Sequence, residues 1–481
     1  MLNGLFFKRT KRIAFNEIRT ALRDGSLLFL VSTSWILLIS SLYVGFLYYK
    51  NSSLDITLSQ QQVRTLWLAQ EDKNPHAAGH YGTYAFKPLS IFNLLEKGIG
   101  PYSGEAIRIE THKQNPPQIR AADDATFLLR SGELTLGFAF LYIIPLLIIV
   151  IVHGMISKEK EQGTLKLALC QGITQSQLLS GKVFGALIIL SVVILPVMML
   201  LGWIIFFNPQ KEAAIFTASI LMLISYAVYF IIFLFTSIAF STFSNSSRQS
   251  LLLLFTFWIT VCIIIPKLSV FVSEWLYPTP AAYEFTQNIE NETLQGSYEG
   301  VAHWQTLNKE AANKLMATYK VSSPDSLPVS VFGYALQLLE EEGHATYERN
   351  YKTLDSLFAK QNSVHSAISV LSPFTNMRSI AMGIAGSDIG DYFHFIDFSE
   401  QYRRNMMGIL NEDIMDHQGH EHQNLNYQGG KDLWQQVPDY QYKPRSFETR
   451  FSGYVFSLLL LVAWLVIAML FIFFSIRRLK L

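Results

Sequence analysis

The stretch Ser157–Lys182, SKEKEQGTLKLALCQGITQSQLLSGK, determines how the rest of the chain is interpreted. It lies between two long apolar segments, Phe138–Ile156 and Val183–Phe206. The stretch is too polar for the core of a bilayer and too short to form a domain of its own. It therefore predicts a hairpin loop between two membrane-spanning helices. Its charged start and amphipathic middle suit docking onto a soluble protein that drives the membrane part.

The composition agrees with a membrane protein that also has large soluble parts. Of the 481 residues, 50% are hydrophobic and only 16% are charged, against about 25% in average soluble domains. The formal net charge of +1 indicates no nucleic-acid partner. The two cysteines, Cys170 and Cys262, fall in the polar loop and in an apolar segment, so no disulfide is expected in the external regions.

Six segments are long and apolar enough to cross a membrane, because a spanning helix needs about 20 mostly apolar residues. They are residues 26–49, 138–156, 183–206, 215–240, 251–275 and 451–476. Within residues 1–25, apolar side chains recur at helical spacing among basic ones, which predicts an amphipathic helix on the membrane surface. The alternative for this arm is a basic flank that only sets the topology.

Basic residues predict the orientation of the spans. Lysine and arginine occur in the N-terminal arm, in the loop 157–182, in the loop 241–250 and in the tail 477–481. With six spans, these four regions fall on the same side of the membrane. We therefore expect a multi-pass protein of the plasma membrane (the bacterial inner membrane) with both termini in the cytoplasm.

The opposite side receives two large insertions, residues 50–137 and 277–450. Together they are expected to form one mainly helical extracytoplasmic domain. Charged and apolar residues from Ser330 to Leu357 alternate at the spacing of an amphipathic helix. The predicted fold is an all-α membrane protein with six transmembrane helices and a mainly helical extracytoplasmic domain formed by the two insertions.

The polar loop also contains a recognisable pattern. Its residues are Glu159, Glu161, Gly163, Thr164 and Leu165, followed by Gly172, Gln177, Leu178, Leu179, Gly181 and Lys182. This pattern resembles the E-x-E-x-G-T-L … G-K loop of ABC-2 type transporter permeases. The predicted surface helix, the six spans and the cytoplasmic termini are similar to that family throughout the membrane part.

A narrower resemblance lies in the insertions. The segments are NPHAAGHYGTY from Asn74 to Tyr84, Ser372–Pro373 with Arg378, Gly386–Ser387–Asp388, Glu400–Gln401–Tyr402–Arg403 and Leu410–Asn411. Together they look like the DUF3526 group of ABC-2 permeases. The resemblance implies a separate ATPase subunit, a second permease copy or paralogue, and export of a substrate that the sequence does not identify. An extracytoplasmic partner is a further expectation.

The chain is not expected to be an enzyme. It contains no G-x-x-x-x-G-K-[ST] phosphate-binding loop. The nearest string, Ser180–Val183, lacks the first glycine and the hydroxyl after the lysine. ATP would therefore act only through a partner ATPase, and energy would enter by contact with the loop 157–182.

The predicted coupling residues share the loop pattern: Glu159, Glu161, Gly163, Thr164, Leu165, Gly172 and Lys182. The two glutamates could pair with cations in a groove of the ATPase. Gly163 and Thr164 are expected to end one helix and cap the next, because glycine accepts unusual backbone angles and threonine is a good N-cap. The alternative is a solvated turn whose charges only set the topology.

Histidines offer the strongest candidate for metal chemistry. His417, His420 and His422 lie in the string DHQGHEH, and imidazoles with carboxylates suit Zn or Cu. The alternative is a flexible solvated loop. His76 and His80 are four residues apart, and we expect them to have a structural hydrogen-bonding role. A second functional hypothesis follows from these features: a membrane-anchored binding or signalling component that captures a ligand without translocation.

Two features of the spans have alternative interpretations. Pro145, Pro196 and Pro266 could allow the helices to bend or could form static kinks. The hydroxyl-bearing residues of the fourth span, among them Tyr229, could line a substrate path. Packing between helices is the favoured interpretation for them.

Overall fold

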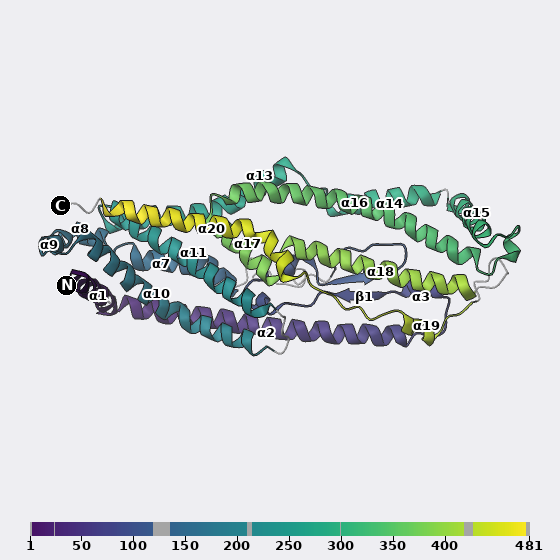
Figure 1. Ribbon diagram of the computed structural model, residues 1–481, viewed down its shortest axis with the longest axis horizontal. Coiled ribbons are helices and arrows are strands. Elements are labelled where there is room, and N and C mark those ends of the chain that lie inside the picture. The colour runs from purple at the N-terminus through teal and green to yellow at the C-terminus, as the bar shows by residue number, and fades with distance from the viewer. Residues whose placement is uncertain are drawn as a thin grey trace.

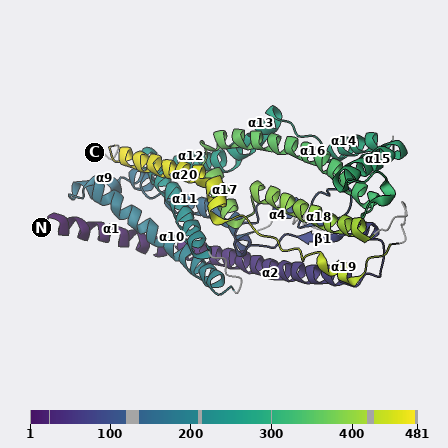
Figure 2. The same cartoon turned by 45° about the vertical axis from the view of Figure 1, so that its right-hand side comes forward.

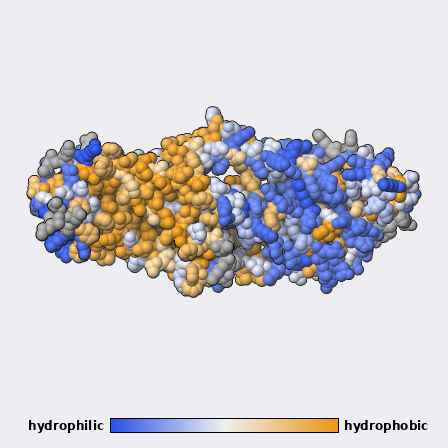
Figure 3. All heavy atoms as spheres, in the orientation of Figure 1, coloured by the Kyte–Doolittle hydropathy of each residue, from blue (hydrophilic) through white to orange (hydrophobic). Residues whose placement is uncertain are grey.

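The computed structural model describes residues 2–23, 25–118, 135–208, 214–298, 300–417 and 427–477. Its helices lie along one long axis (Figure 1). The surface is hydrophobic over one half of this axis and hydrophilic over the other (Figure 3). Among these residues, six helices are long and apolar enough to cross a membrane: Leu27–Leu68, Leu136–Glu161, Gln175–Phe206, Ile215–Phe243, Ser247–Leu276 and Phe447–Ile476. The prediction of an all-α membrane protein with six spans is confirmed.

We call the hydrophobic half the membrane bundle. It contains α1 (Leu2–Arg23), the first part of α2 (Ser26–Leu68), α6 (Leu136–Phe138), α7 (Ile144–Val152), α8 (Ser157–Glu161), α9 (Thr164–Cys170), α10 (Gln175–Phe206), α11 (Ile215–Phe243), α12 (Ser247–Ile259), α13 (Ile265–Leu276), α17 (Pro373–Ala385) and α20 (Phe447–Ile476). Two π-helical turns, Ala139–Ile143 and Thr260–Ile264, join α6 to α7 and α12 to α13.

We call the hydrophilic half the distal domain. It contains the rest of α2, α3 (Pro75–Tyr81), β1 (Thr83–Phe86), α4 (Gly100–Ser103), β2 (Ala106–Ile109), α14 (Ala282–Tyr298), α15 (Gly300–Tyr319), η4 (Pro324–Ser326), α16 (Val331–Ser369), α18 (Ile389–His417) and α19 (Lys431–Gln436). Between β1 and β2, η1 (Ile91–Leu94) packs into the core of the membrane bundle. Strands β1 and β2 pair antiparallel, with Thr83 opposite Ile109. The amphipathic helix predicted from Ser330 is confirmed as α16, which begins where the Ser330 side chain accepts a hydrogen bond from the Gly333 amide.

Helix α2 connects the two halves without a break. Its 43 residues extend about 64 Å at 1.5 Å per residue, roughly twice the thickness of a hydrocarbon core. The polar residues after position 49 mark the end of the predicted span, but the helix continues because its far end packs into the distal domain. There Trp67 is buried and its indole donates a 2.9 Å hydrogen bond to the carbonyl of Trp434. Figure 2 shows α2 and α16 along opposite sides of the distal domain.

Two prolines follow the π-helical turns directly. Pro145 and Pro266 are each the second residue of the α-helix after such a turn. Proline has no N–H group and its ring collides with the preceding turn, and a wider turn relieves both problems. The carbonyl of Leu141, four residues before Pro145, accepts a 2.8 Å hydrogen bond from the hydroxyl of Tyr229. Tyr229 therefore acts as a packing residue between helices, which is the favoured interpretation of the fourth-span hydroxyls.

The third proline, Pro196, lies inside α10, and the carbonyl four residues before it also accepts a hydrogen bond from another helix. The carbonyl of Val192, four residues before Pro196, accepts a 3.2 Å hydrogen bond from the indole of Trp35 in α2. Neighbouring helices thus satisfy carbonyls that the prolines leave free, as membrane helices require. This arrangement favours static kinks over hinges.

Helix α17 differs from the simple division into spans and insertions. It belongs to the second insertion, yet Phe374, Met377 and Ile380 are buried in the same hydrophobic core as α11 and α20. Its 13 residues are too few to span a bilayer, so a hydropathy criterion misses it. Ser372 caps the helix and donates a 2.6 Å hydrogen bond to the carbonyl of Val261. The Ser372–Pro373 pattern thus starts a helix that anchors the second insertion to the membrane bundle.

Candidate functional site at the loop between the second and third spans

The loop 157–182 lies at the end of the bundle that also carries both termini (Figure 1). It folds as α8, α9 and the first two turns of α10, and α8 is joined to α9 through Gly163 at φ +75°. A Cβ atom at Gly163 would meet nothing within 4 Å, so the backbone conformation rather than space requires glycine. Gly163 is itself the N-cap of α9. The capping role predicted for Thr164 is not observed, because its hydroxyl instead donates a 3.3 Å hydrogen bond to the carbonyl of Glu159 in α8.

Lys182, the last residue of this stretch, has a buried side chain with two acidic partners. Its side chain is 1% exposed, and its ammonium group donates to Glu17 of α1 and to Glu159 of α8, both at 2.8 Å. Lys182 itself lies in α10, so these two ion pairs join three elements; we call them the Lys182 clasp. Glu159, predicted to meet cations of a partner, already has a cationic partner inside the chain.

Glycines allow α1 and α10 to pack closely beside the clasp. A Cβ atom at Gly181 would lie 2.6 Å from the Cβ of Ile13, and one at Gly185 would lie 3.2 Å from the carbonyl oxygen of Ala14. Arg9 of α1 also donates a hydrogen bond to the carbonyl of Gly172. The predicted N-terminal helix is thus present, and it contacts the turn after α9 and the first turns of α10.

The other side of α8 is attached to α11 and α12. The ammonium group of Lys160 donates to carbonyls of Thr242 and Ser244 at the end of α11. A carboxylate oxygen of Glu161 accepts a 3.2 Å hydrogen bond from the amide of Ser247, the first residue of α12. Each charge complements the dipole of the helix end that it meets. The loop is therefore fixed to α1, α10, α11 and α12.

The outer face of α9 is exposed. Leu165 is buried in the hydrophobic core, whereas Leu167 is 64% exposed. Thr164, Lys166 and Cys170 are exposed beside it. Leu167 is absent from the predicted coupling residues, although the apolar residues at 165, 167 and 169 already show that one leucine of α9 must face away from the others.

The comparison with protein families agrees with this architecture. The model of the family described as ABC-2 family transporter protein matches residues 12–479. The chain is a member of the ABC-2 transporter family. No curated protein matches the sequence. The resemblance to ABC-2 permeases is thereby confirmed, whereas membership of the DUF3526 group stays a prediction.

The described histidine of the predicted metal site in this ABC-2 transporter chain, His417, lies in the distal domain, far from the loop. His417 ends α18, where its Nδ1 atom is 3.1 Å from the carbonyl oxygen of Asp413 and its ring stacks on Tyr427. The two other members of the predicted metal site, His420 and His422, lie outside the described residues. A different group of histidines is brought together in the distal domain and is considered below.

Proposed function

We propose that the chain is the permease subunit of an ABC exporter and that a separate ATPase binds the loop 157–182 in the cytoplasm. Family membership supports a permease-type membrane subunit. The observation that carries the proposal is the Lys182 clasp, which joins the loop to α1 and α10. Because the loop is fixed in this way, a displacement of the loop by the ATPase would move the attached helices of the bundle and not only deform the loop. Basic residues at the same end support a cytoplasmic location for it.

The mechanism follows from these attachments. ATP binding closes two ATPase subunits, and their movement displaces α8 and α9 in each of two permease chains, identical or paralogous. The displacement passes through the clasp to α10 and through Lys160 and Glu161 to α11 and α12. Relative movement of these helices opens a path between the two chains, and the substrate leaves on the distal side.

The docking surface on the permease is the outer face of α9. Leu167 presents an exposed apolar side chain there, with Lys166 beside it. An isolated apolar side chain surrounded by polar residues can act as an anchor in a pocket of a partner. Glu161 and Lys166 would then form the charged rim of the contact.

The test is a mild-detergent purification from native cells with identification of the proteins that co-purify. We expect an ABC ATPase with the unmodified chain and its loss with Leu167→Asp. Leu66→Asp is the matched control, because Leu66 is also exposed (48%) but lies in the distal part of α2. Recovery of envelope proteins without an ATPase, or equal ATPase recovery with Leu167→Asp, would contradict the proposal.

A second candidate function uses the distal domain as a ligand-binding module without translocation. It is favoured by a cavity of about 560 Å³ between α2 and the segment before α20, lined by Arg64, Tyr402 and Asp439 among others. Arg64 and Asp439 form an ion pair in its wall. The same purification separates the two functions, because a binding module would co-purify without an ATPase.

A further inference from the structure

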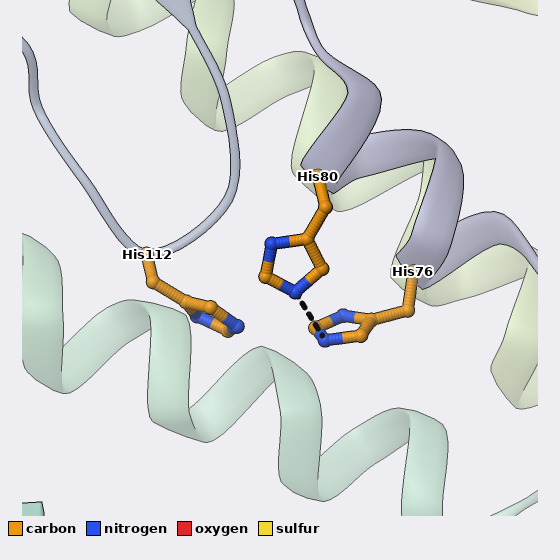
Figure 4. Close-up of side chains that lie close together, drawn as sticks. All are labelled: His76, His80 and His112. Carbon is orange, nitrogen blue, oxygen red and sulfur yellow. Dashed lines mark hydrogen bonds between the residues drawn. The ribbon is translucent and has the colours of Figure 1, made fainter.

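Three histidines of the distal domain face one another (Figure 4). His76 and His80 lie on α3, one helical turn apart, and His112 lies in the loop after β2. Helix α3 begins at Pro75, where the side chain of Asn74 accepts a hydrogen bond from the His76 amide. Because residues i and i+4 lie on the same face of a helix, the rings of His76 and His80 lie on the same side of α3. The pairing of β1 with β2 then brings His112 to them.

We propose that His76, His80 and His112 form a binding site for a late first-row divalent metal ion, with Zn²⁺ as the expected occupant. The Nε2 atoms of His76 and His80 are 3.2 Å apart. Two imidazoles bound to tetrahedral zinc at 2.0–2.1 Å would be separated by about 3.3 Å. Ligand nitrogens of all three rings lie within 4.8 Å of one another, so an inward movement of His112 by at most about 1.5 Å completes the set.

The choice of metal follows from the ligand type. Imidazole nitrogen suits Zn, Cu and Ni, whereas Ca²⁺ and Mg²⁺ require oxygen ligands. The side chain of His80 is exposed and the other two are partly buried. A fourth coordination position therefore faces solvent, where water or a group from an external ligand can bind.

The Nδ1 atoms of His112 and His80 each lie within hydrogen-bonding distance of a side-chain oxygen of a neighbouring residue. Nδ1 of His112 lies 2.7 Å from Oε1 of Glu340, and Nδ1 of His80 lies 2.9 Å from Oγ1 of Thr111. Histidine ligands of metals commonly donate their second nitrogen to such a partner, which fixes the tautomer and directs the lone pair of Nε2 at the metal. Glu340 is in turn bound by Arg403 at 3.0 Å.

The backbone at His112 supports the same assignment. His112 has φ +62°, a left-handed conformation that is uncommon outside glycine and that costs about 1 kcal/mol or more. Its amide donates a 2.9 Å hydrogen bond to the same oxygen of Glu340 that contacts its ring. One carboxylate thus holds both the backbone and the ring of His112 in place.

Metal binding would also connect the two insertions. His112 belongs to the first insertion, and Glu340 lies on α16 in the second. A bound ion would draw His112 toward α3 while Glu340 keeps it attached to α16. We therefore expect the metal to stabilise the distal domain as a unit.

The test uses the full chain in detergent, purified without a polyhistidine tag, with Co²⁺ as a spectroscopic probe and Zn²⁺ as competitor. We expect one Co²⁺ per chain with the visible absorption of tetrahedral nitrogen ligation, displaced by Zn²⁺. His80→Gln changes an exposed side chain and should weaken binding at least 100-fold or so, and Thr111→Val about 10-fold through the lost positioning contact. The control is the triple variant His417→Gln, His420→Gln, His422→Gln, which should bind as the unmodified chain does.

A second variant keeps the proposal testable if His80→Gln is poorly folded. His112→Asn removes the ligand, and asparagine tolerates the left-handed backbone. Whatever its unfolding temperature without metal, that temperature should not rise on adding Zn²⁺, whereas that of the unmodified chain should. The proposal is overturned if no Co²⁺ binds at micromolar concentration, if His80→Gln and His112→Asn bind as the unmodified chain does, or if only the triple variant loses the metal. In those cases the 3.2 Å contact is a hydrogen bond between neutral rings.

Discussion

Lys182 shows how a single buried charge can organise a loop. Its ammonium group is removed from water, while Glu17 and Glu159 keep 15% and 31% of their side-chain surface. Lys182→Met should lower the free energy of unfolding by about 2 kcal/mol, below the 3–5 kcal/mol of a fully buried pair, because the two carboxylates left behind are partly solvated. Unfolding in detergent, followed by tryptophan fluorescence, measures the loss.

The matched control removes the carboxylates as well. Lys182→Met combined with Glu17→Gln and Glu159→Gln leaves no unpaired charge and should regain most of the lost stability. If the triple variant is no more stable than Lys182→Met alone, packing of the lysine stem rather than charge pairing explains the effect.

The raised pKa of Asp355 on α16 predicts that the stability of the folded protein depends on pH. Burial, with the nearby charge of Asp397, raises the pKa of Asp355 to about 6. Within the described part of the chain, its Oδ1 atom is buried without a hydrogen-bond partner. The folded protein therefore binds a proton more tightly than the unfolded chain, so the free energy of unfolding falls as pH rises from about 4 to about 6.

Asp355→Asn removes this dependence. At pH 7 the variant should be more stable by roughly 1 kcal/mol, a value reduced for solvent screening at a partly exposed site, and at pH 4 it should gain nothing. Unfolding temperatures between pH 4 and pH 8 measure the difference. Glu71→Gln, at an exposed position of the same domain, serves as the control, and an equal gain at both pH values would argue against titration of Asp355.

At the scale of elements, the packing of α1 against α10 depends on a glycine that has no room for a side chain. Gly181→Ala adds a Cβ atom 2.6 Å from the Cβ of Ile13, and overpacking of this kind costs about 1–3 kcal/mol. Gly202→Ala is the control on the same helix, because its Cβ would meet nothing within 4 Å. It should be neutral or slightly stabilising, since alanine favours helix. Protease cleavage of α1 should accelerate only in Gly181→Ala, and similar cleavage of both variants would contradict this packing.

The elements also show which features a sequence can predict. Hydropathy located all six spans, because a bilayer requires long apolar helices and the apolar residues of each one are consecutive in the sequence. It could not predict that α2 continues to Leu68, because a polar helix is stabilised by tertiary contacts such as that of Trp67 with Trp434. Helix α17 was missed because 13 residues resemble any short apolar run.

The candidate sites divide in the same way. The loop pattern identified Glu159 and Lys182, but the partner Glu17 lies 165 residues before Lys182, and no local pattern connects them. The spacing of His76 and His80 was visible, whereas His112 joins them only through the β1–β2 pairing and a left-handed turn. Contacts between distant segments of the chain were therefore the part that the sequence did not reveal.

At the scale of the whole molecule, two long helices of the described residues are among the connections between the distal domain and the membrane bundle. One is α2, which passes through both halves. The other is α16, which packs on α13, where Nδ1 of His365 lies 2.8 Å from the hydroxyl of Ser269. Both are long single helices, so a displacement at the loop end can reach the distal domain without passing through a flexible linker.

Breaking one of these connections tests whether the two halves act together. Asp55 is exposed on α2 after the predicted span, and Asp55→Pro removes a helix hydrogen bond at a cost of about 3 kcal/mol. Under the proposed function and the proposed metal site, we expect the variant still to bind an ATPase at α9 and a metal at the three histidines, since both sites are remote from Asp55, but to lose the proposed ATP-dependent export. Hydrogen exchange should increase in α2 near residue 51. Asp55→Ala should behave as the unmodified chain, and full activity of Asp55→Pro would mean that α2 is not needed for movement between the halves.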